Sequence, residues 1–181
     1  MDFLETIEQI PSDNIILLPN NPNVIPTANL VQTLSGKNVR VIPTETVPQG
    51  IAAMVTFIPE IDFDQNIAEM MEAFGSVKTI EITRATRATT VSDIDIRAGQ
   101  MIGLLDGELL AAADTPADVI MDLLKRLDMT AVEFITLYYG KDTTVEEARE
   151  IGDAVSGAYP NAEVGVVAGG QPNYFYLISV E

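Results

Sequence analysis

The sequence contains no histidine, no cysteine and no tryptophan among its 181 residues. Without histidine there is no Ser-His-Asp triad and no imidazole general base. Without cysteine there are no disulfides, thiol nucleophiles or thiolate metal sites, so nothing indicates an oxidising compartment. These absences leave Asp, Glu, Lys and Tyr for any acid–base chemistry.

Positive charge is also scarce. Ten Lys and Arg stand against 27 Asp and Glu, which gives a formal net charge of −17 at pH 7. Contacts to phosphate need Lys and Arg, so this charge argues against binding nucleic acid or an anionic membrane surface. No apolar run reaches the roughly 18 residues of a membrane span, and no signal-peptide pattern is found. We therefore expect a cytoplasmic protein without membrane insertion.

The first half of the chain alternates short strands with helices. Continuous apolar runs at residues 15–18 and 39–42 are typical of buried strands. Pro26 and Pro48 suit first helical positions, and Asp62 suits an N-cap. Strands that alternate with helices predict right-handed parallel crossovers. The sequence therefore predicts a Rossmann-like α/β half over residues 1–76.

The second half, residues 77–181, has a different pattern. Asp106-Gly107 between two apolar runs predicts a β-hairpin, and Thr144 with Glu147 predicts a capping box that opens a helix. Residues 162–168 and 174–180 are typical of two final strands. We expect an α+β half with a mixed sheet, packed closely against the first half as a second domain or within one structural unit.

Motifs for nucleotides and metals are missing. None of the twelve glycines falls into G-x-G-x-x-G or G-x-x-x-x-G-K-[ST]. Paired carboxylates such as Asp93 and Asp95 arise by chance among 27 acids, and no calcium loop surrounds them. The sequence predicts no phosphate cradle and no metal site.

Polar side chains follow the first two predicted strands. In an open parallel sheet, ligands bind beyond the carboxyl ends of the strands. If the two strands are neighbours, these side chains form one rim that can bind a ligand or a partner. The same residue types are also what tight turns require, so both interpretations stay open. The rim consists of Asn20, Asn21, Asn23, Thr44, Glu45, Thr46 and Gln49.

Two further features have a structural and a functional interpretation. Arg84 and Arg87, three apart on a predicted strand, would face opposite sides and either pair with surplus acids or bind an anionic partner. The strand at 174–180 is apolar and aromatic on both faces. It is either a core strand or a patch covered by another protein chain.

Four segments carry a resemblance to a known family. They read PSDNIILLPNN at 11–21, VRVIPT at 39–44, YYGKDTTVEE at 138–147 and GGQPNYFYLISVE at 169–181. Together they resemble the C-terminal region of the dihydroxyacetone-kinase-like family, whose characterised members are the ATP-binding subunit of bacterial two-component fatty acid kinase. One departure is Pro22, where a lysine is common in the family loop, which weakens any shared role in anion binding.

The resemblance implies a fold similar to that of the DegV-type fatty-acid-carrier subunit. It also implies that ATP and magnesium bind to an N-terminal kinase domain that these residues do not include, so no kinase residue has a position here. We expect no cofactor and no catalysis in this fragment.

The hypothesis from sequence is a non-catalytic docking or regulatory domain that engages the acyl-carrier subunit. Its net charge predicts a partner rich in Lys and Arg, with binding weakened by salt. One alternative is a domain that binds a fatty acid or another small carboxylate. Another is a homodimerisation module that uses the C-terminal strand. The candidate contacts are the polar rim, Arg84, Arg87, Gly169, Gly170 and Gln171.

Overall fold

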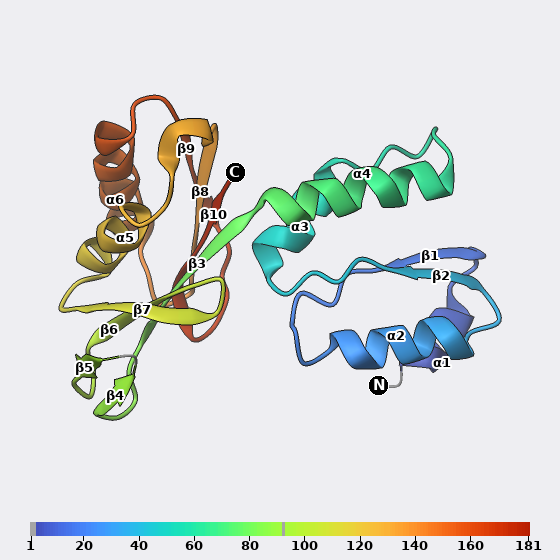
Figure 1. Cartoon of the computed structure of the whole chain (residues 1–181), viewed down its shortest axis with the longest axis horizontal. Coiled ribbons are helices and arrows are strands. Elements are labelled where there is room, and N and C mark those ends of the chain that lie inside the picture. The colour runs from blue at the N-terminus through green and yellow to red at the C-terminus, as the bar shows by residue number, and fades with distance from the viewer. Residues whose placement is uncertain (1–2, 92) are drawn as a thin grey trace. The chain divides into compact units, whose positions relative to one another are not determined.

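The computed structural model describes residues 3–91 and 93–181 (Figure 1). The chain forms two compact units, Met1–Val77 and Lys78–Glu181. Each unit has its own clusters of buried hydrophobic side chains. Within the described residues, no helix is both long enough and apolar enough to traverse a bilayer.

The first unit is a two-stranded parallel sheet between two pairs of helices (Figure 1). Strand β1 pairs with β2 in a register that places Ile15 opposite Val39. Helix α2 is the crossover between the two strands, as the alternating sequence pattern predicts. The elements are α1 (Phe3–Gln9), β1 (Asn14–Leu17), α2 (Ile25–Leu34), β2 (Asn38–Val41), α3 (Val47–Val55) and α4 (Phe63–Ser76).

Both faces of this small sheet are covered by helices. Successive side chains of a strand point to opposite sides, so neighbouring residues of β1 pack into different clusters. Ile15 packs with Ile7 of α1 and Val31 of α2 in one cluster. The next residue, Ile16, packs against a second cluster that contains Met70 of α4. This arrangement confirms the Rossmann-like character of the first half, with two strands in the sheet.

The second unit is built on a six-stranded sheet in the order β7-β6-β3-β10-β8-β9. Only β8 and β9 are parallel neighbours in it, and the other pairs are antiparallel. The mixed sheet predicted for this half is therefore confirmed. The elements are β3 (Lys78–Arg84), β4 (Thr89–Val91), β5 (Ile94–Ile96), β6 (Met101–Leu105), β7 (Glu108–Ala113), α5 (Pro116–Leu124), a 3₁₀ turn (Met129–Ala131), β8 (Phe134–Tyr139), α6 (Val145–Ala158), β9 (Glu163–Ala168) and β10 (Tyr174–Val180).

Local signals in the sequence set the ends of these elements. Asp106 and Gly107 have φ angles of 49° and 81°, the positive values that a type I′ turn requires between β6 and β7. Thr115 caps α5 through its side chain. Thr144 and Glu147 form the complete capping box of α6.

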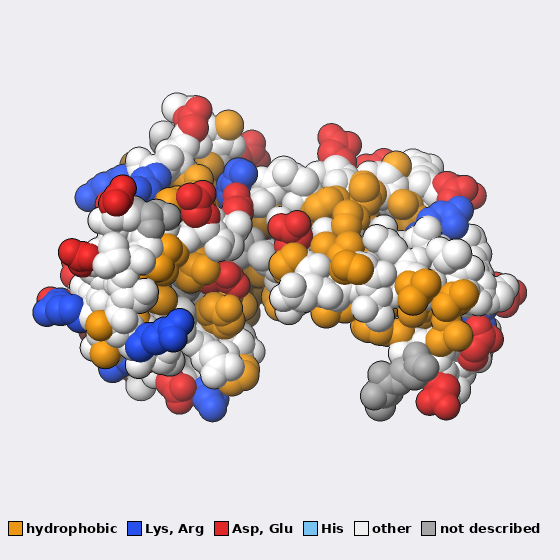
Figure 2. Space-filling view, turned by 60° about the horizontal axis from the view of Figure 1, so that its bottom comes forward, with side chains coloured by type: hydrophobic (Ala, Val, Ile, Leu, Met, Phe, Trp, Pro, Cys, Tyr) orange, Lys and Arg blue, Asp and Glu red, His pale blue; other side chains and the backbone are white. Residues whose placement is uncertain are grey.

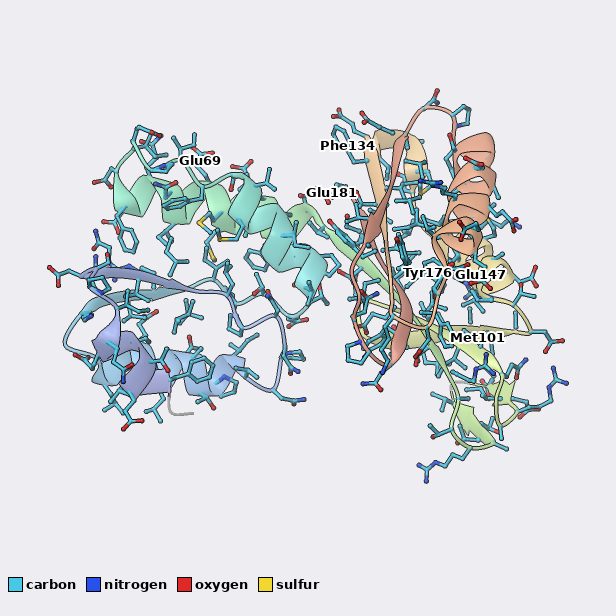
Figure 3. All side chains as sticks on the ribbon, turned by 180° about the vertical axis from the view of Figure 1, so that it is seen from behind. Glu69, Met101, Phe134, Glu147, Tyr176 and Glu181 are labelled. Carbon is cyan, nitrogen blue, oxygen red and sulfur yellow. The ribbon has the colours of Figure 1, made fainter. Side chains whose placement is uncertain are left out.

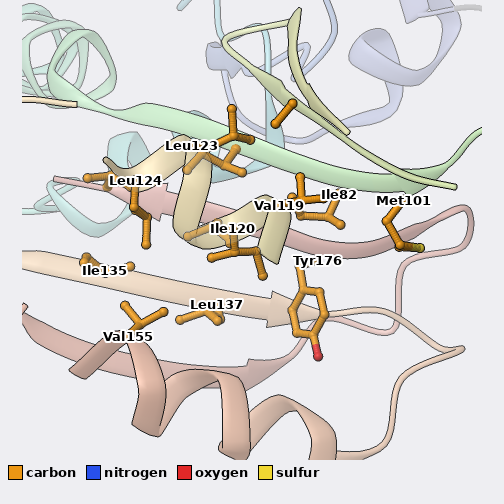
Figure 4. Close-up of a cluster of buried hydrophobic side chains, with 14 of the residues drawn as sticks. Ile82, Met101, Val119, Ile120, Leu123, Leu124, Ile135, Leu137, Val155 and Tyr176 are labelled. Atoms are coloured by element: carbon orange, nitrogen blue, oxygen red, sulfur yellow. The ribbon is translucent and has the colours of Figure 1, made fainter. Parts of the chain in front are cut away.

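Helices α5 and α6 cover one face of the six-stranded sheet. The hydrophobic side chains between these helices and the sheet are closely packed (Figure 4). A Cβ atom on Gly103 would lie 2.4 Å from Val119 Cγ1 and 2.6 Å from Leu123 Cδ1, so the sheet and α5 meet without spare room. The largest fully buried side chains of this layer are Ile80, Ile82, Ile120, Leu123, Leu124, Ile135, Leu137, Tyr176 and Ile178.

One expectation about this unit needs correction, and one of two open interpretations is confirmed. Strand β3 ends at Arg84, and Arg87 lies in the exposed turn before β4, so the two arginines do not occupy opposite faces of one strand. Strand β10 lies between β3 and β8, with both of its hydrogen-bonding edges occupied. Residues 176–180 are buried, so β10 is the core strand that one of the two interpretations predicted, and neither of its edges is free to pair with another chain. The small β4–β5 hairpin is not predicted by the sequence pattern.

Candidate functional site

The loops that follow β1 and β2 meet at one end of the first unit's sheet. The Asn20 N–H donates to Thr44 Oγ1 (3.1 Å), and the Thr44 hydroxyl donates to Asn20 Oδ1 (2.8 Å). Thr44 is fully buried, and Asn20 has a φ of 53°, a left-handed conformation that asparagine tolerates. The two loops therefore lie next to each other, as predicted, and Asn20 of one loop is hydrogen-bonded to Thr44 of the other.

The Asn20 amide fills the space between the two loops. Gly50, in the first turns of α3, has no Cβ, and a Cβ there would lie 2.1 Å from Asn20 Oδ1. The crevice expected beyond the strand ends is thus occupied by the protein's own side chain. A small molecule would have to displace the partly buried Asn20 side chain from its hydrogen bond with the buried Thr44 in order to bind here.

The other polar residues of the rim serve as turn and cap groups. Asn21 Oδ1 accepts from the Asn23 N–H at 2.9 Å. Gln49 Oε1 accepts from the Glu45 N–H at 2.7 Å, and Thr46 caps α3. The exposed side chains are those of Asn21, Asn23 and Glu45, which present amides and one carboxylate to solvent.

In the second unit, the loop between β9 and β10 is fastened to the end of β8. The Gly169 and Gly170 N–H groups both donate to the Tyr139 carbonyl, at 3.0 and 3.1 Å. Gln171 Nε2 donates to the Tyr138 carbonyl at 2.8 Å. The exposed Gly169-Gly170 peptide is therefore held in a fixed position, which suits a contact surface.

Arg84 lines a pocket of about 280 Å³ in the second unit, together with Met101, Phe175, Glu147 and Glu150 among others. Its guanidinium lies 5.4 Å from the centroid of the Phe175 ring, a cation–π arrangement. Glutamates and aspartates outnumber this one arginine in the pocket lining. The pocket therefore disfavours a carboxylate ligand, and Arg84 is balanced by the surplus acids.

Tyr176 lies buried near Glu147 in the same unit (Figure 3). Burial raises the pKa of Tyr176 to about 12, and the negative charge of Glu147 adds to the rise, while a hydrogen bond with Thr143 opposes it. The phenol is therefore protonated at neutral pH and cannot act as a base there. Burial also raises the pKa of Glu81 on β3.

The capping box of α6 gives a pH prediction. Hydrogen bonds from the Thr144 N–H and hydroxyl hold the pKa of Glu147 below its usual value of 4.5. A lowered pKa in the folded state stabilises the protein above the unfolded value and stops doing so as the pH falls through the folded value. We expect Glu147→Gln to lose less free energy of unfolding than the native chain between about pH 6 and pH 3.

Urea unfolding of both proteins at each pH measures this difference. The matched control is Glu146→Gln, which changes the neighbouring glutamate, an exposed residue that is not part of the capping box. An equal flattening of the pH dependence in both variants would contradict the role of the cap.

Contacts between distant segments of the chain could not be predicted from the sequence pattern. Phe175 beneath Arg84 and Gln171 against the Tyr138 carbonyl had no signal in the sequence, because the partners lie far apart along the chain. Among the described residues, no group of three or more Asp or Glu is placed to hold a metal ion.

The fold defines the chain as a DegV-like α/β protein. It matches the Streptococcus pneumoniae fatty acid kinase (Fak) B3 protein loaded with linoleic acid, with a TM-score of 0.66 and 10% identity over 99% of this chain and 74% of that one. It also matches DegV, a fatty acid binding protein from Bacillus subtilis, with a TM-score of 0.62 and 14% identity over 98% and 74% of the two chains. At these identities the likeness concerns the fold, and it confirms the expected architecture.

The family follows from the sequence itself. The model of the FakA-like C-terminal family of fatty acid kinase matches residues 1–181, and the chain belongs to this family. Protein YloV of Bacillus subtilis is 32% identical over 99% of this chain, and an uncharacterised protein of Staphylococcus haemolyticus is 33% identical over 99%. The chain spans about a third of the length of these curated relatives, 32% and 33%. The resemblance stated from the sequence is thus confirmed.

Proposed function

We propose that the chain is a non-catalytic docking domain of a fatty acid kinase, and that it engages the kinase's DegV-type fatty-acid-carrier subunit. The observation that carries the proposal is the filled crevice between the loops after β1 and β2. Asn20 and Thr44 occupy the place where a small ligand would sit, while Asn21, Asn23 and Glu45 remain exposed around it. A surface of this kind suits a protein partner.

The charge of the chain supports the same proposal. A net charge of −17 favours a partner surface that carries Lys and Arg. The Arg84 pocket, with its excess of carboxylates, disfavours the alternative that this domain holds the fatty acid itself. We place the binding of ATP and magnesium in a kinase domain outside these residues. We also place the protein in the cytoplasm.

The test is a calorimetric titration of this chain with its cognate acyl-loaded carrier protein. We expect saturable binding whose Kd rises at least about tenfold between low and high salt, because screening weakens attraction between exposed charges. We also expect Glu45→Lys to weaken binding more than Glu72→Lys, an equal charge change on the exposed surface of α4.

No binding of the carrier would overturn the proposed function. Equal losses of affinity in Glu45→Lys and Glu72→Lys would show that the loop after β2 is not part of the interface. Binding of free oleate by the chain, in the absence of the carrier, would favour the fatty-acid-binding alternative instead.

A further inference from the structure

Within the described residues, the two-stranded sheet of the first unit leaves the Ile16 main chain, on the outer edge of β1, unpaired. The Asp13 carbonyl accepts from the Asn38 N–H, and the Leu17 carbonyl accepts from the Ile42 N–H. In a parallel pair alternate residues bond to the neighbour, so Ile16 directs its N–H and C=O away from β2. In the described part of the chain, the Ile16 main chain has no hydrogen-bond partner on that side.

The opposite edge of the same sheet is protected. The Val41 N–H on the outer side of β2 donates to Gln32 Oε1 at 2.9 Å, and the Val39 N–H donates to the Lys37 carbonyl at 3.0 Å. Exposed strand edges are usually blocked in this way, because they pair readily with other chains. On the β1 edge the Asn14 carbonyl accepts from the Ser12 hydroxyl at 2.9 Å, which leaves the Ile16 main chain as the available part of that edge.

An apolar groove of about 440 Å³ runs beside Ile16. Hydrophobic side chains gather on the surface of the first unit (Figure 2). Met54, at the end of α3, is 52% exposed, although it lines a groove in the protein surface. The main lining side chains are those of Ile16, Met54, Phe57, Ile61 and Phe63.

The groove is rimmed by negative charge. Asp13 precedes β1, and Glu60, Asp62 and Asp64 lie in and beside the segment that carries Ile61 and Phe63; all four carboxylates are exposed. Only Lys37 and Arg40 are basic in residues 1–77. The Arg40 guanidinium pairs with Asp64 at 3.5 Å, so Asp13, Glu60 and Asp62 supply the excess negative charge of the rim. A fatty acid would bring its carboxylate into this field, so the charge favours a cationic occupant.

We propose that the β1 edge and this groove bind an extended segment of a partner protein, one that alternates apolar residues with Lys or Arg. Its main chain pairs with Ile16 and adds a third strand to the sheet. Its apolar side chains enter the groove, and its basic side chains face the acidic rim. This inference goes beyond the docking function above, since the surface shares no residue with the polar rim and the partner need not be the fatty acid carrier.

The test uses a synthetic peptide, acetyl-Lys-Val-Lys-Val-Arg-Val-Lys-amide, titrated into the ¹⁵N- and methyl-labelled chain and followed by NMR. We expect saturable shifts at the amides of residues 14–17 and at the Met54 and Ile61 methyl groups. We also expect slower hydrogen exchange of the Ile16 amide. The counterpart peptide with Glu in place of Lys and Arg should not bind.

The matched variants are Met54→Lys and Val55→Lys. Met54 lines the groove, whereas Val55 is the next residue of α3, is 79% exposed and lies outside the groove lining. We expect Met54→Lys to raise the peptide Kd at least about tenfold, since it removes an apolar contact and adds a like charge. Val55→Lys should change it by less than about threefold.

Three results would overturn the inference. One is equal losses for both variants, which indicates general attraction to an acidic protein. Another is oleate displacing the peptide shifts at the same methyl groups. The third is the same shifts appearing on concentration of the chain alone, which makes a second copy the occupant. The titration with the carrier protein tests the polar rim around Glu45, whereas the peptide titration tests the β1 edge and the groove. Either proposal can therefore fail without the other.

Discussion

Replacing Gly140 with alanine is expected to lower the free energy of unfolding by about 3 kcal/mol or more. Gly140 is buried at the end of β8, where the loop after β9 returns to the sheet. A Cβ there would lie 2.0 Å from the Tyr174 carbonyl oxygen and 2.9 Å from that of Gln171. Both atoms belong to the main chain, so relief requires β10 and its preceding loop to move. Urea unfolding at equilibrium measures the loss.

Two other glycines serve as controls for this prediction. In Gly103→Ala the new methyl group meets the side chains of Val119 and Leu123, which can shift, so the loss should be about 1–3 kcal/mol. Gly157, in the last turn of α6, has nothing within 4 Å of a new Cβ. Alanine at Gly157 should raise stability by about 0.5–1 kcal/mol. A loss at Gly140 no larger than that at Gly103 would contradict the main-chain collision.

The features that could be predicted from sequence are those in which the interacting residues are close along the chain. The Asp106-Gly107 turn and the Thr144–Glu147 capping box each involve residues at most three apart, and the structure forms both. The parallel pairing of β1 and β2 was predictable for a related reason. A strand, a helix and a second strand in succession have few ways to fold back on one another.

The order of the strands in the second unit was not predictable in this way. Strand β10 inserts between β3 and β8, which are separated from each other by about fifty residues of sequence. The run of apolar and aromatic residues in β10 is the same for a central strand and for a strand covered by another chain. The pattern does not say which strands pair with β10. It therefore cannot decide between a core strand and an interface strand.

For the candidate site the sequence indicated the neighbourhood and left the chemistry open. The proximity of the loops that carry Asn20 and Thr44 could be predicted, because the carboxyl ends of parallel strands meet at one edge of the sheet. It could not tell that Asn20 fills the crevice, since that depends on the missing Cβ of Gly50, thirty residues later. The groove beside Ile16 was also missed, because its lining comes from three separate elements.

Asn66→Asp should be among the most destabilising substitutions in the first unit. Asn66 is 2% exposed and fixes the segment before α4. Its Oδ1 accepts from the Ile58 N–H at 2.8 Å, and its Nδ2 donates to the carbonyls of Ile58 (2.8 Å) and Asp62 (3.4 Å). A carboxylate has no proton to donate, so it would face two carbonyl oxygens while buried. We expect a loss of about 3–5 kcal/mol in the free energy of unfolding at pH 7.

Asn66→Ala separates the charge from the lost hydrogen bonds. It leaves the Ile58 N–H and C=O without their partner and should cost about 2–3 kcal/mol at any pH. The new carboxyl of Asn66→Asp has its pKa raised by burial and by the facing carbonyls, so it protonates as the pH falls and can then donate to Ile58 O. Its deficit relative to Asn66→Ala should therefore shrink from pH 7 to about pH 4. Urea unfolding of the two variants at both pH values measures this, and equal stabilities at pH 7 would show that Asn66 does not discriminate against charge.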